Sequence, residues 1–258
     1  MGILLIAILA VFSYVTLGFI ISIFIKRNDI ADVMWGPGIF IAVLSTYFVQ
    51  INVASESIVF LILIGLWALR IFLHIGSRFI SKSEEDFRYK VWRDTWKYFY
   101  LRSYLQVFLL QGFLMLLVSS SAVFFIYFGL NLKSPYFIVG IIFALAALIF
   151  ETFADQQLKS FLKLKTGGIM NTGLWKYSRH PNYFGEVSFW WGLFVITLPS
   201  SATIFINPLF LVSPLVITYL ILYISGIPLL EKKYDDNIEF QTYKSKTSAF
   251  FPWFPKKN

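Results

Sequence analysis

Residues 57–79 read SIVFLILIGLWALRIFLHIGSRF, an apolar run that contains two arginines and one histidine. The run can cross a bilayer as a helix, because a spanning helix needs about 20 mostly apolar residues. Six further runs have the same character, at residues 2–25, 33–51, 104–128, 135–157, 184–206 and 208–230. The sequence therefore predicts an all-α integral membrane protein, a bundle of seven transmembrane helices that forms one domain over residues 1–258.

The composition supports this class. The 258 residues are 58% hydrophobic and only 14% charged, whereas a soluble domain is about half apolar and a quarter charged. The chain has no cysteine, which excludes disulfides, thiolate catalysis and cysteine-bound metal. The first apolar run lacks a basic region before it and is too long for a signal peptide, so we expect a retained helix.

Loops rich in Lys and Arg alternate with loops that have almost none, and this alternation predicts the orientation of the chain in the membrane. Basic residues follow the first run (Lys26 and Arg27) and fill segments 78–103, 159–183 and the tail, whereas the intervening loops contain only Lys133. Basic loops stay in the cytoplasm, so we expect the N-terminus outside and the C-terminus inside. The net charge of +8 then reflects topology rather than nucleic-acid binding. The predicted location is the plasma or inner membrane of a prokaryote, or the endoplasmic reticulum of a eukaryote.

Residues 178–186, SRHPNYFGE, place several polar groups where a cytoplasmic loop enters the sixth predicted span. Pro181 suits the first turn of a helix, and free N–H groups there favour an anion beside Arg179. His180 could donate to a phosphate or transfer a proton. Glu186 lies one turn inside the span, where a carboxylate is costly unless it is paired or functional. The alternative is a helix start anchored by Arg179 and Tyr183.

Three other groups of residues are candidates for a site. Glu151 and Asp155 share one helix face at the end of the fifth span, so we expect a cation or a ligand between them. They could instead form a structural ion-pair face, and a phosphate-bridging divalent metal is a weaker option, with only two histidines in the chain. Arg70, His74 and Arg78 repeat every four residues in the third span, so we expect a polar stripe that faces the interior of the bundle. Such a stripe indicates a functional site, and the alternative is that the side chains, Arg78 above all, reach the cytoplasmic interface.

Asp32 precedes the second span, where it serves either as a helix-dipole partner or as a proton donor. Glu231 ends the seventh span and aromatic residues, Tyr234 among them, follow it. These aromatics either close over a ligand or form an interfacial belt.

The assembled motifs resemble the membrane steroid 5-alpha-reductase-like superfamily, in particular its mostly bacterial branch. The resemblance covers nearly the whole chain, through DVMWG at 32–36, LWALR at 66–70, QVFLLQG at 106–112, residues 151–158, TGLWKYSRHPNYFGE at 172–186 and residues 225–253. It implies an NADPH-dependent enzyme that reduces an activated carbon–carbon double bond in a lipophilic substrate from the bilayer. The implied cofactor-binding residues are Glu151, Asp155, Lys163, Lys165, Arg179, His180, Asn182, Tyr183, Glu186, Glu231 and Tyr234. Arg70, His74 and Asp32 are the implied catalytic residues.

The sequence departs from the steroid reductases in one respect, since it has no Gln-Glu pair on the second helix, and steroid specificity is therefore not expected. Isoprenylcysteine and phospholipid methyltransferases, which bind S-adenosylmethionine, carry a similar Arg-His-Pro-x-Tyr-x-Gly element. Their x is usually Ser or Met, and no Glu follows the Gly. Asn182 and Glu186 favour the reductase, and the methyltransferase stays as the alternative.

Overall fold

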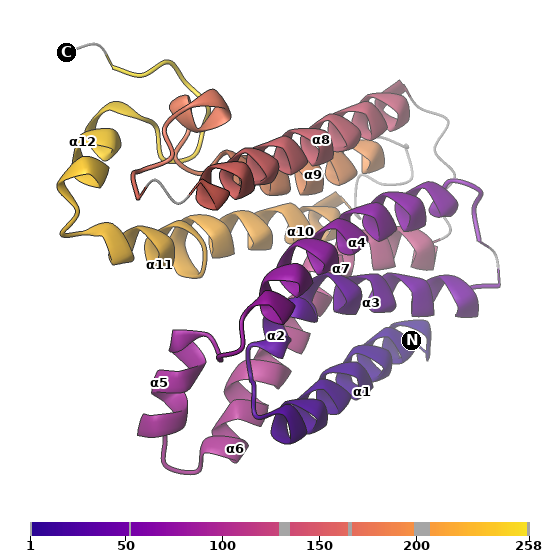
Figure 1. Cartoon of the computed structure of the whole chain (residues 1–258). Coiled ribbons are helices and arrows are strands. Elements are labelled where there is room, and N and C mark those ends of the chain that lie inside the picture. The colour runs from indigo at the N-terminus through magenta and orange to yellow at the C-terminus, as the bar shows by residue number, and fades with distance from the viewer. Residues whose placement is uncertain (1, 52, 129–134, 165–166, 199–206, 257–258) are drawn as a thin grey trace. The chain divides into compact units, whose positions relative to one another are not determined.

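The computed structural model describes residues 2–51, 53–128, 135–164, 167–198 and 207–256, and every regular element within them is a helix (Figure 1). The elements are α1 Gly2–Ile25, α2 Ile30–Val33, α3 Trp35–Val49, α4 Ser57–Ser81, α5 Phe87–Thr95, α6 Phe99–Ser103, the π-helical η1 Tyr104–Leu109, α7 Leu110–Phe128, α8 Pro135–Lys163, η2 Gly173–Lys176, α9 Pro181–Thr197, α10 Asn207–Tyr219, the π-helical η3 Leu220–Ile224, α11 Ile227–Glu231, η4 Lys232–Tyr234 and α12 Ile238–Lys246. The prediction of an all-α protein is confirmed for these residues.

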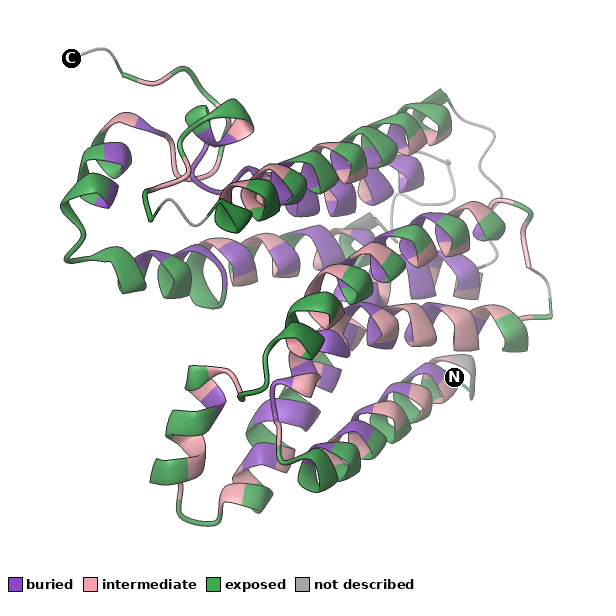
Figure 2. Ribbon diagram, viewed as in Figure 1, coloured by how far each residue is buried: buried purple, intermediate pink, exposed green. Residues whose placement is uncertain are grey.

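Five helical segments are long and apolar enough to cross a membrane. They are Leu4–Ile25, Ser57–Ser81, Phe99–Phe128, Pro135–Lys163 and Pro208–Tyr234. Each exposes large apolar side chains along its length, and Figure 2 shows exposed residues running along the outer side of α1 and α4. Exposed apolar surface of this extent needs lipid as its solvent. The chain is therefore a helical protein suited to a membrane.

The other two predicted spans are shorter than expected. The run 33–51 forms α3, which has 15 residues and is about 22 Å long at 1.5 Å per residue. The run 184–206 forms α9, which has 17 residues. Residues 199–206 lie outside the described part of the chain. Helix α9 begins at Pro181, three residues before the predicted boundary, because proline supplies the helical φ and its missing N–H has no partner in a first turn.

Two helices extend beyond the apolar runs that were predicted as spans. Helix α8 continues to Lys163 rather than ending at 157, and the helix before α7 begins at Phe99 rather than 104. Hydropathy marks the end of the apolar region, but a helix continues into polar sequence until a residue interrupts its backbone hydrogen bonds. The seventh run matches α10, η3 and α11, with a break at Ser225 and Gly226.

The chain divides into two compact units. The first comprises residues 1–132 and 205–213. Its core lies where α3, α4 and α7 pack, and the rings of Phe60 and Phe125 stack there at 4.2 Å between centroids. Ile39, Ile64 and Trp67 are fully buried in the same unit. These helices place the residues around Asp32 at one end of the unit.

The second unit comprises residues 133–204 and 214–258, and its main feature is the close packing of α8 against α9. Three glycines make the close approach possible. A Cβ atom at Gly185 would lie 2.6 Å from Cβ of Glu151, one at Gly192 would lie 2.8 Å from the backbone N of Ala144, and one at Gly140 would lie 2.6 Å from the backbone N of Ile196. Small residues at contacts are how membrane helices approach closely. This packing brings the predicted polar residues of both helices together.

Candidate functional site

The contact between α8 and α9 collects four polar side chains. Asn182 donates its side-chain N–H to Oδ1 of Asp155 over 3.1 Å. Glu151 lies one turn before Asp155 on α8, Glu186 lies one turn after Asn182 on α9, and Gly185 packs directly on Glu151. All three carboxyl side chains belong to buried residues. The structure therefore brings together two groups that the sequence proposed separately, the pair Glu151 and Asp155 and the motif that contains Asn182 and Glu186.

The carboxamide of Asn182 is only half satisfied. Its nitrogen donates to Asp155, but Oδ1 is buried and has no hydrogen-bond partner among the described residues. A buried acceptor without a partner costs about 1–3 kcal/mol. Such an atom suits a ligand that presents an N–H or O–H donor beside α8 and α9.

Arg179 is the centre of a second buried cluster and lies three residues before Asn182 in the chain. Its Nε and Nη2 donate to the two carboxylate oxygens of Glu231 over 2.8 and 3.2 Å, and Nη1 donates to the carbonyl oxygen of Thr247 over 2.5 Å. His180 Nε2 and Lys244 Nζ also contact Glu231, at 3.0 and 3.2 Å. A forked guanidinium–carboxylate pair of this kind is strong and directional. The Nε, Nη1 and Nη2 atoms of Arg179 thus all donate hydrogen bonds within the protein.

This cluster ties the C-terminal segment to the loop before α9. The backbone N–H of Arg179 donates to the carbonyl of Ser248 over 2.8 Å, and Oγ of Ser178 donates to that of Phe250 over 2.8 Å. The Tyr243 hydroxyl donates to the carbonyls of Trp175 and Ser178. Burial raises the pKa of Tyr243 well above its usual value. These hydrogen bonds therefore hold segment 243–250 against the loop that precedes α9.

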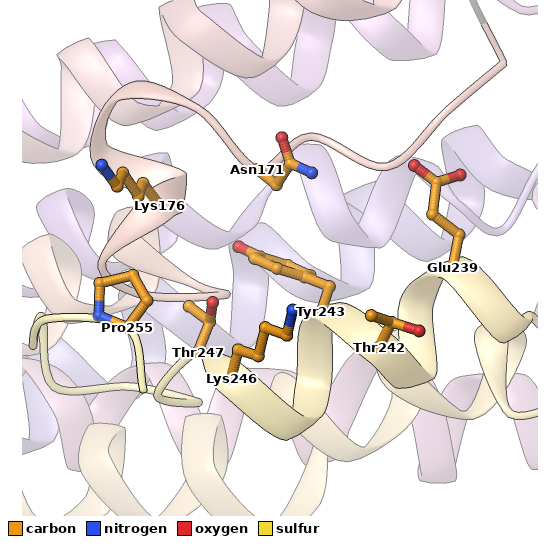
Figure 3. Close-up of a pocket in the computed structure, with 8 residues that line it drawn as sticks. All are labelled: Asn171, Lys176, Glu239, Thr242, Tyr243, Lys246, Thr247 and Pro255. Atoms are coloured by element: carbon orange, nitrogen blue, oxygen red, sulfur yellow. The ribbon is translucent and has the colours of Figure 1, made fainter. Parts of the chain in front are cut away.

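A hollow of about 430 Å³ opens between α12 and the segment before α9. Figure 3 shows Asn171 and Lys176 on one side and the α12 side chains Tyr243 and Lys246 on the other. Its remaining lining residues are Glu239, Thr242, Thr247 and Pro255. The lining has two lysines and one carboxylate, Glu239, so its net positive charge favours an anionic group near the lysines.

The remaining predicted residues of the second unit lie nearby or at its surface. The ring of Tyr183 stacks on that of His180 at 5.6 Å between centroids. Tyr234 is 43% exposed and packs against Phe240. Lys163 is exposed at the last turn of α8, and Lys165 lies outside the described residues. Among these described residues, Tyr183 is the one whose ring stacks on a member of the Arg179 cluster.

Asp32 has a local environment of its own in the first unit. One carboxylate oxygen accepts from Arg88 Nη2 over 2.7 Å, and the other accepts from the Tyr89 hydroxyl over 2.6 Å. Burial opposes the charge on Arg88, but Asp32 and then Asp86 outweigh it and raise the pKa of that guanidinium. Burial first and Asp32 second raise the pKa of Tyr89 well above its usual value. Asp32 thus links α2 to α5.

Arg70 and His74 are only partly buried on α4. The face of α4 that enters the core is formed by other residues, with Phe60, Ile64 and Trp67 at its centre. The two predicted residues are thus less buried than the core residues of the same helix.

The comparisons with known proteins add a family. The family model described as "Protein of unknown function (DUF1295)" matches residues 18–247. The chain belongs to this family. The family is linked to the steroid 5-alpha-reductase-like superfamily, in agreement with the resemblance found in the sequence. No curated protein and no solved structure matches the chain.

In this DUF1295 chain, several partners of the predicted site residues were absent from the sequence prediction. Lys244 and the Thr247 carbonyl complete the surroundings of Glu231 and Arg179, and Arg88 and Tyr89 engage Asp32. Each partner lies more than 10 residues from the group it contacts. The sequence around each residue does not indicate such distant partners. The one hint is the high number of arginine and aromatic residues in 87–103.

Proposed function

We propose that this protein is a membrane-embedded oxidoreductase that uses NADPH to reduce an activated carbon–carbon double bond in a lipophilic substrate. The observation that carries the proposal is the buried Oδ1 atom of Asn182, which has no partner among the described residues, next to the hydrogen bond to Asp155. The N–H groups of a nicotinamide carboxamide and the O–H groups of a ribose can both donate a hydrogen bond to this oxygen. When bound, NADPH would supply the hydride.

The residues of the α8–α9 contact fit such a cofactor in chemical type. Asp155 holds Asn182 in one orientation, so that the amide oxygen is directed before the ligand arrives. Glu186 and Glu151 are acceptors for ribose hydroxyl groups on the same helix pair. Preorganised polar groups of this kind fix the position of a cofactor without changing its chemistry.

The phosphate groups of NADPH need positively charged side chains nearby. The contacts of Arg179 favour other residues than Arg179 for this role. Arg179 is engaged with Glu231, so we assign it and His180 to holding the loop and the C-terminal segment in place. Lys176 and Lys246 face the hollow beside α12 and are the better phosphate partners. In this proposal, the anionic part of the cofactor lies at the water-exposed side of the second unit.

The full proposal keeps seven spans, with α3 and α9 as short ones. The N-terminus lies outside and the C-terminus in the cytoplasm, as the distribution of cations favours. The lipophilic substrate enters from the bilayer, and NADPH enters from the cytoplasm. Arg70 and His74 remain proposed catalytic residues, since both are polar groups in a span.

A binding titration tests the proposal. Purified wild-type protein in detergent should bind NADPH saturably and more tightly than S-adenosylmethionine, which the methyltransferase alternative would favour. Glu186→Gln should weaken NADPH binding by about tenfold, because a hydrogen bond to a charged group contributes about 1.5–3 kcal/mol. Glu84→Gln, an exposed carboxylate outside the proposed site, tests whether any loss of negative charge has the same effect. Tighter S-adenosylmethionine binding, or equal NADPH affinity for wild type and Glu186→Gln, would contradict the proposal.

A further inference from the structure

The segment that joins α4 to α7 displays apolar side chains outside the packed core. Helix α5 exposes Val91 at 52%. The turn after it together with the short helix α6, residues 96–103, is called the turn into α6 here, and it exposes Tyr98 at 70%, Tyr100 at 56% and Leu101 at 58%. Most of this segment, from 82 to 98, lies outside the helices long enough to span a membrane. Exposed tyrosine and aliphatic side chains in such a place are typical of the membrane–water interface.

The same turn carries positive charge that the protein does not neutralise. Arg88 and Arg93 are paired with Asp32 and Glu85, at 2.7 and 2.8 Å. Among the described residues no carboxylate lies within ion-pair distance of the other two cations of the turn, Lys97 and Arg102. Arg102 lies over the ring of Trp96 at 4.6 Å, and Lys97 lies 5.3 Å from the ring of Tyr98. Both cations are thus held beside aromatic rings at a surface.

The turn has a specific backbone shape. Tyr98 has a φ of 59°, in the left-handed region that a residue with a side chain enters at a cost of about 1–2 kcal/mol. The Trp92 and Trp96 rings stack at 5.0 Å immediately before it. This shape reverses the chain so that Lys97 and Tyr98 form its tip.

Hydrogen bonds fix the segment at one end of the first unit. Arg27 donates to the carbonyl oxygens of Phe79 and Lys82 over 3.0 and 2.7 Å, which joins the end of α1 to the end of α4. The backbone N–H of Asp86 donates to Asp29 over 3.2 Å, and Asn28 donates to Ser103 over 2.8 Å. The segment is therefore held where long apolar helices begin or end, which is the depth of lipid headgroups.

We infer that α5 and the turn into α6 form a docking surface for acidic phospholipid headgroups. Lys97 and Arg102 bind the phosphates, while Val91, Tyr98 and Tyr100 enter the region between the headgroups and the acyl chains. The charge complementarity and the exposed aromatic side chains both favour a lipid surface over a protein partner. The inference rests on the first unit alone and is independent of the proposed reductase activity.

The absence of cysteine in the chain makes a direct test possible. Single variants Val91→Cys and Glu84→Cys carry a nitroxide spin label in the full-length protein, reconstituted in nanodiscs of phosphatidylcholine with or without phosphatidylglycerol. We expect the label at 91 to be accessible to oxygen and protected from a water-soluble nickel chelate, more so with phosphatidylglycerol. The label at 84 should stay accessible to the chelate, because Glu84 is an exposed carboxylate.

Charge variants make the test specific. In the Val91→Cys background, Lys97→Gln with Arg102→Gln should remove the effect of phosphatidylglycerol on protection, while Lys232→Gln with Lys233→Gln should leave it intact. Three results would overturn the inference: equal chelate access at 91 and 84, protection independent of phosphatidylglycerol, or spin–spin broadening between labels at 91, which would indicate a second copy of the chain. Gel filtration of each variant separates these results from misfolding.

Discussion

Asn182 on α9 and Asp155 on α8 are joined by one hydrogen bond of 3.1 Å, although 27 residues separate them in the chain. The bond uses the donor of the amide and leaves its buried oxygen available. A single side chain thus connects the packing of two helices to the proposed binding of a cofactor.

The first prediction concerns this amide. Asn182→Ser should weaken NADPH binding by about tenfold, because the shorter side chain loses both the contact to Asp155 and the directed acceptor. The thermal stability in detergent should change little. The control is Asn237→Ser, which alters a helix cap that serine also fills. A loss of affinity of the same size in Asn237→Ser would contradict the specific role of Asn182.

The second prediction concerns the buried ion cluster. Glu231→Gln should destabilise the protein by about 3–5 kcal/mol, because it leaves the buried Arg179 guanidinium without its forked partner. Unfolding curves in denaturing detergent would measure this change. The double variant Arg179→Met with Glu231→Leu removes both charges and should recover part of the loss. If the double variant is as unstable as the sum of the two single changes, the ion pair is not the cause.

The third prediction concerns the helix contact. Gly185→Ala and Gly192→Ala should each lower stability by more than about 1 kcal/mol, because the added Cβ would lie less than 3.0 Å from backbone atoms of α8. Gly76→Ala is the matched control, since its Cβ would meet only a Val33 methyl group at 3.7 Å. Thermal melts of the three variants would test this. A destabilised Gly76→Ala variant would show that helix glycines matter here for another reason.

The fourth prediction concerns Asp32. Asp32→Asn should destabilise the first unit by about 1–3 kcal/mol, since Arg88 loses a charged partner and Tyr89 loses a charged acceptor. Glu84→Gln, which removes only an exposed contact of 3.8 Å to Lys90, should change stability by less than about 1 kcal/mol. If Asp32→Asn abolishes activity at unchanged stability, Asp32 acts in catalysis rather than as a link.

The fifth prediction concerns pH. Because burial raises the pKa of Tyr243, its phenol should stay protonated at pH values where an ordinary tyrosine, with a pKa of about 10, ionises. The protonated phenol therefore stabilises the fold fully below that pH, and its contribution falls as pH rises towards the shifted pKa. The difference in tyrosinate absorbance between wild type and Tyr243→Phe would measure this. A component that titrates with the exposed tyrosines would contradict the prediction.

The sequence alone determined the helices and the residues they carry. Apolar runs and the position of Pro181 predicted where α1, α4 and α9 lie, since hydropathy and backbone hydrogen bonding in a helix are local. The spacing of Glu151 and Asp155 likewise placed both carboxylates on one face. The short lengths of α3 and α9 and the continuation of α8 to Lys163 were not predicted, because helix ends depend on local interruptions that hydropathy does not register.

Only the tertiary structure decided which side chains meet. Arg179 was predicted to hold a phosphate, yet it pairs with Glu231, 52 residues away, and Asp32 pairs with Arg88 and Tyr89. Partners this far apart are selected by the packing of helices, in which glycines such as Gly185 allow close approach and burial requires every charge to find a partner. The sequence supplies the charges and the faces, and the pairing depends on which faces come into contact.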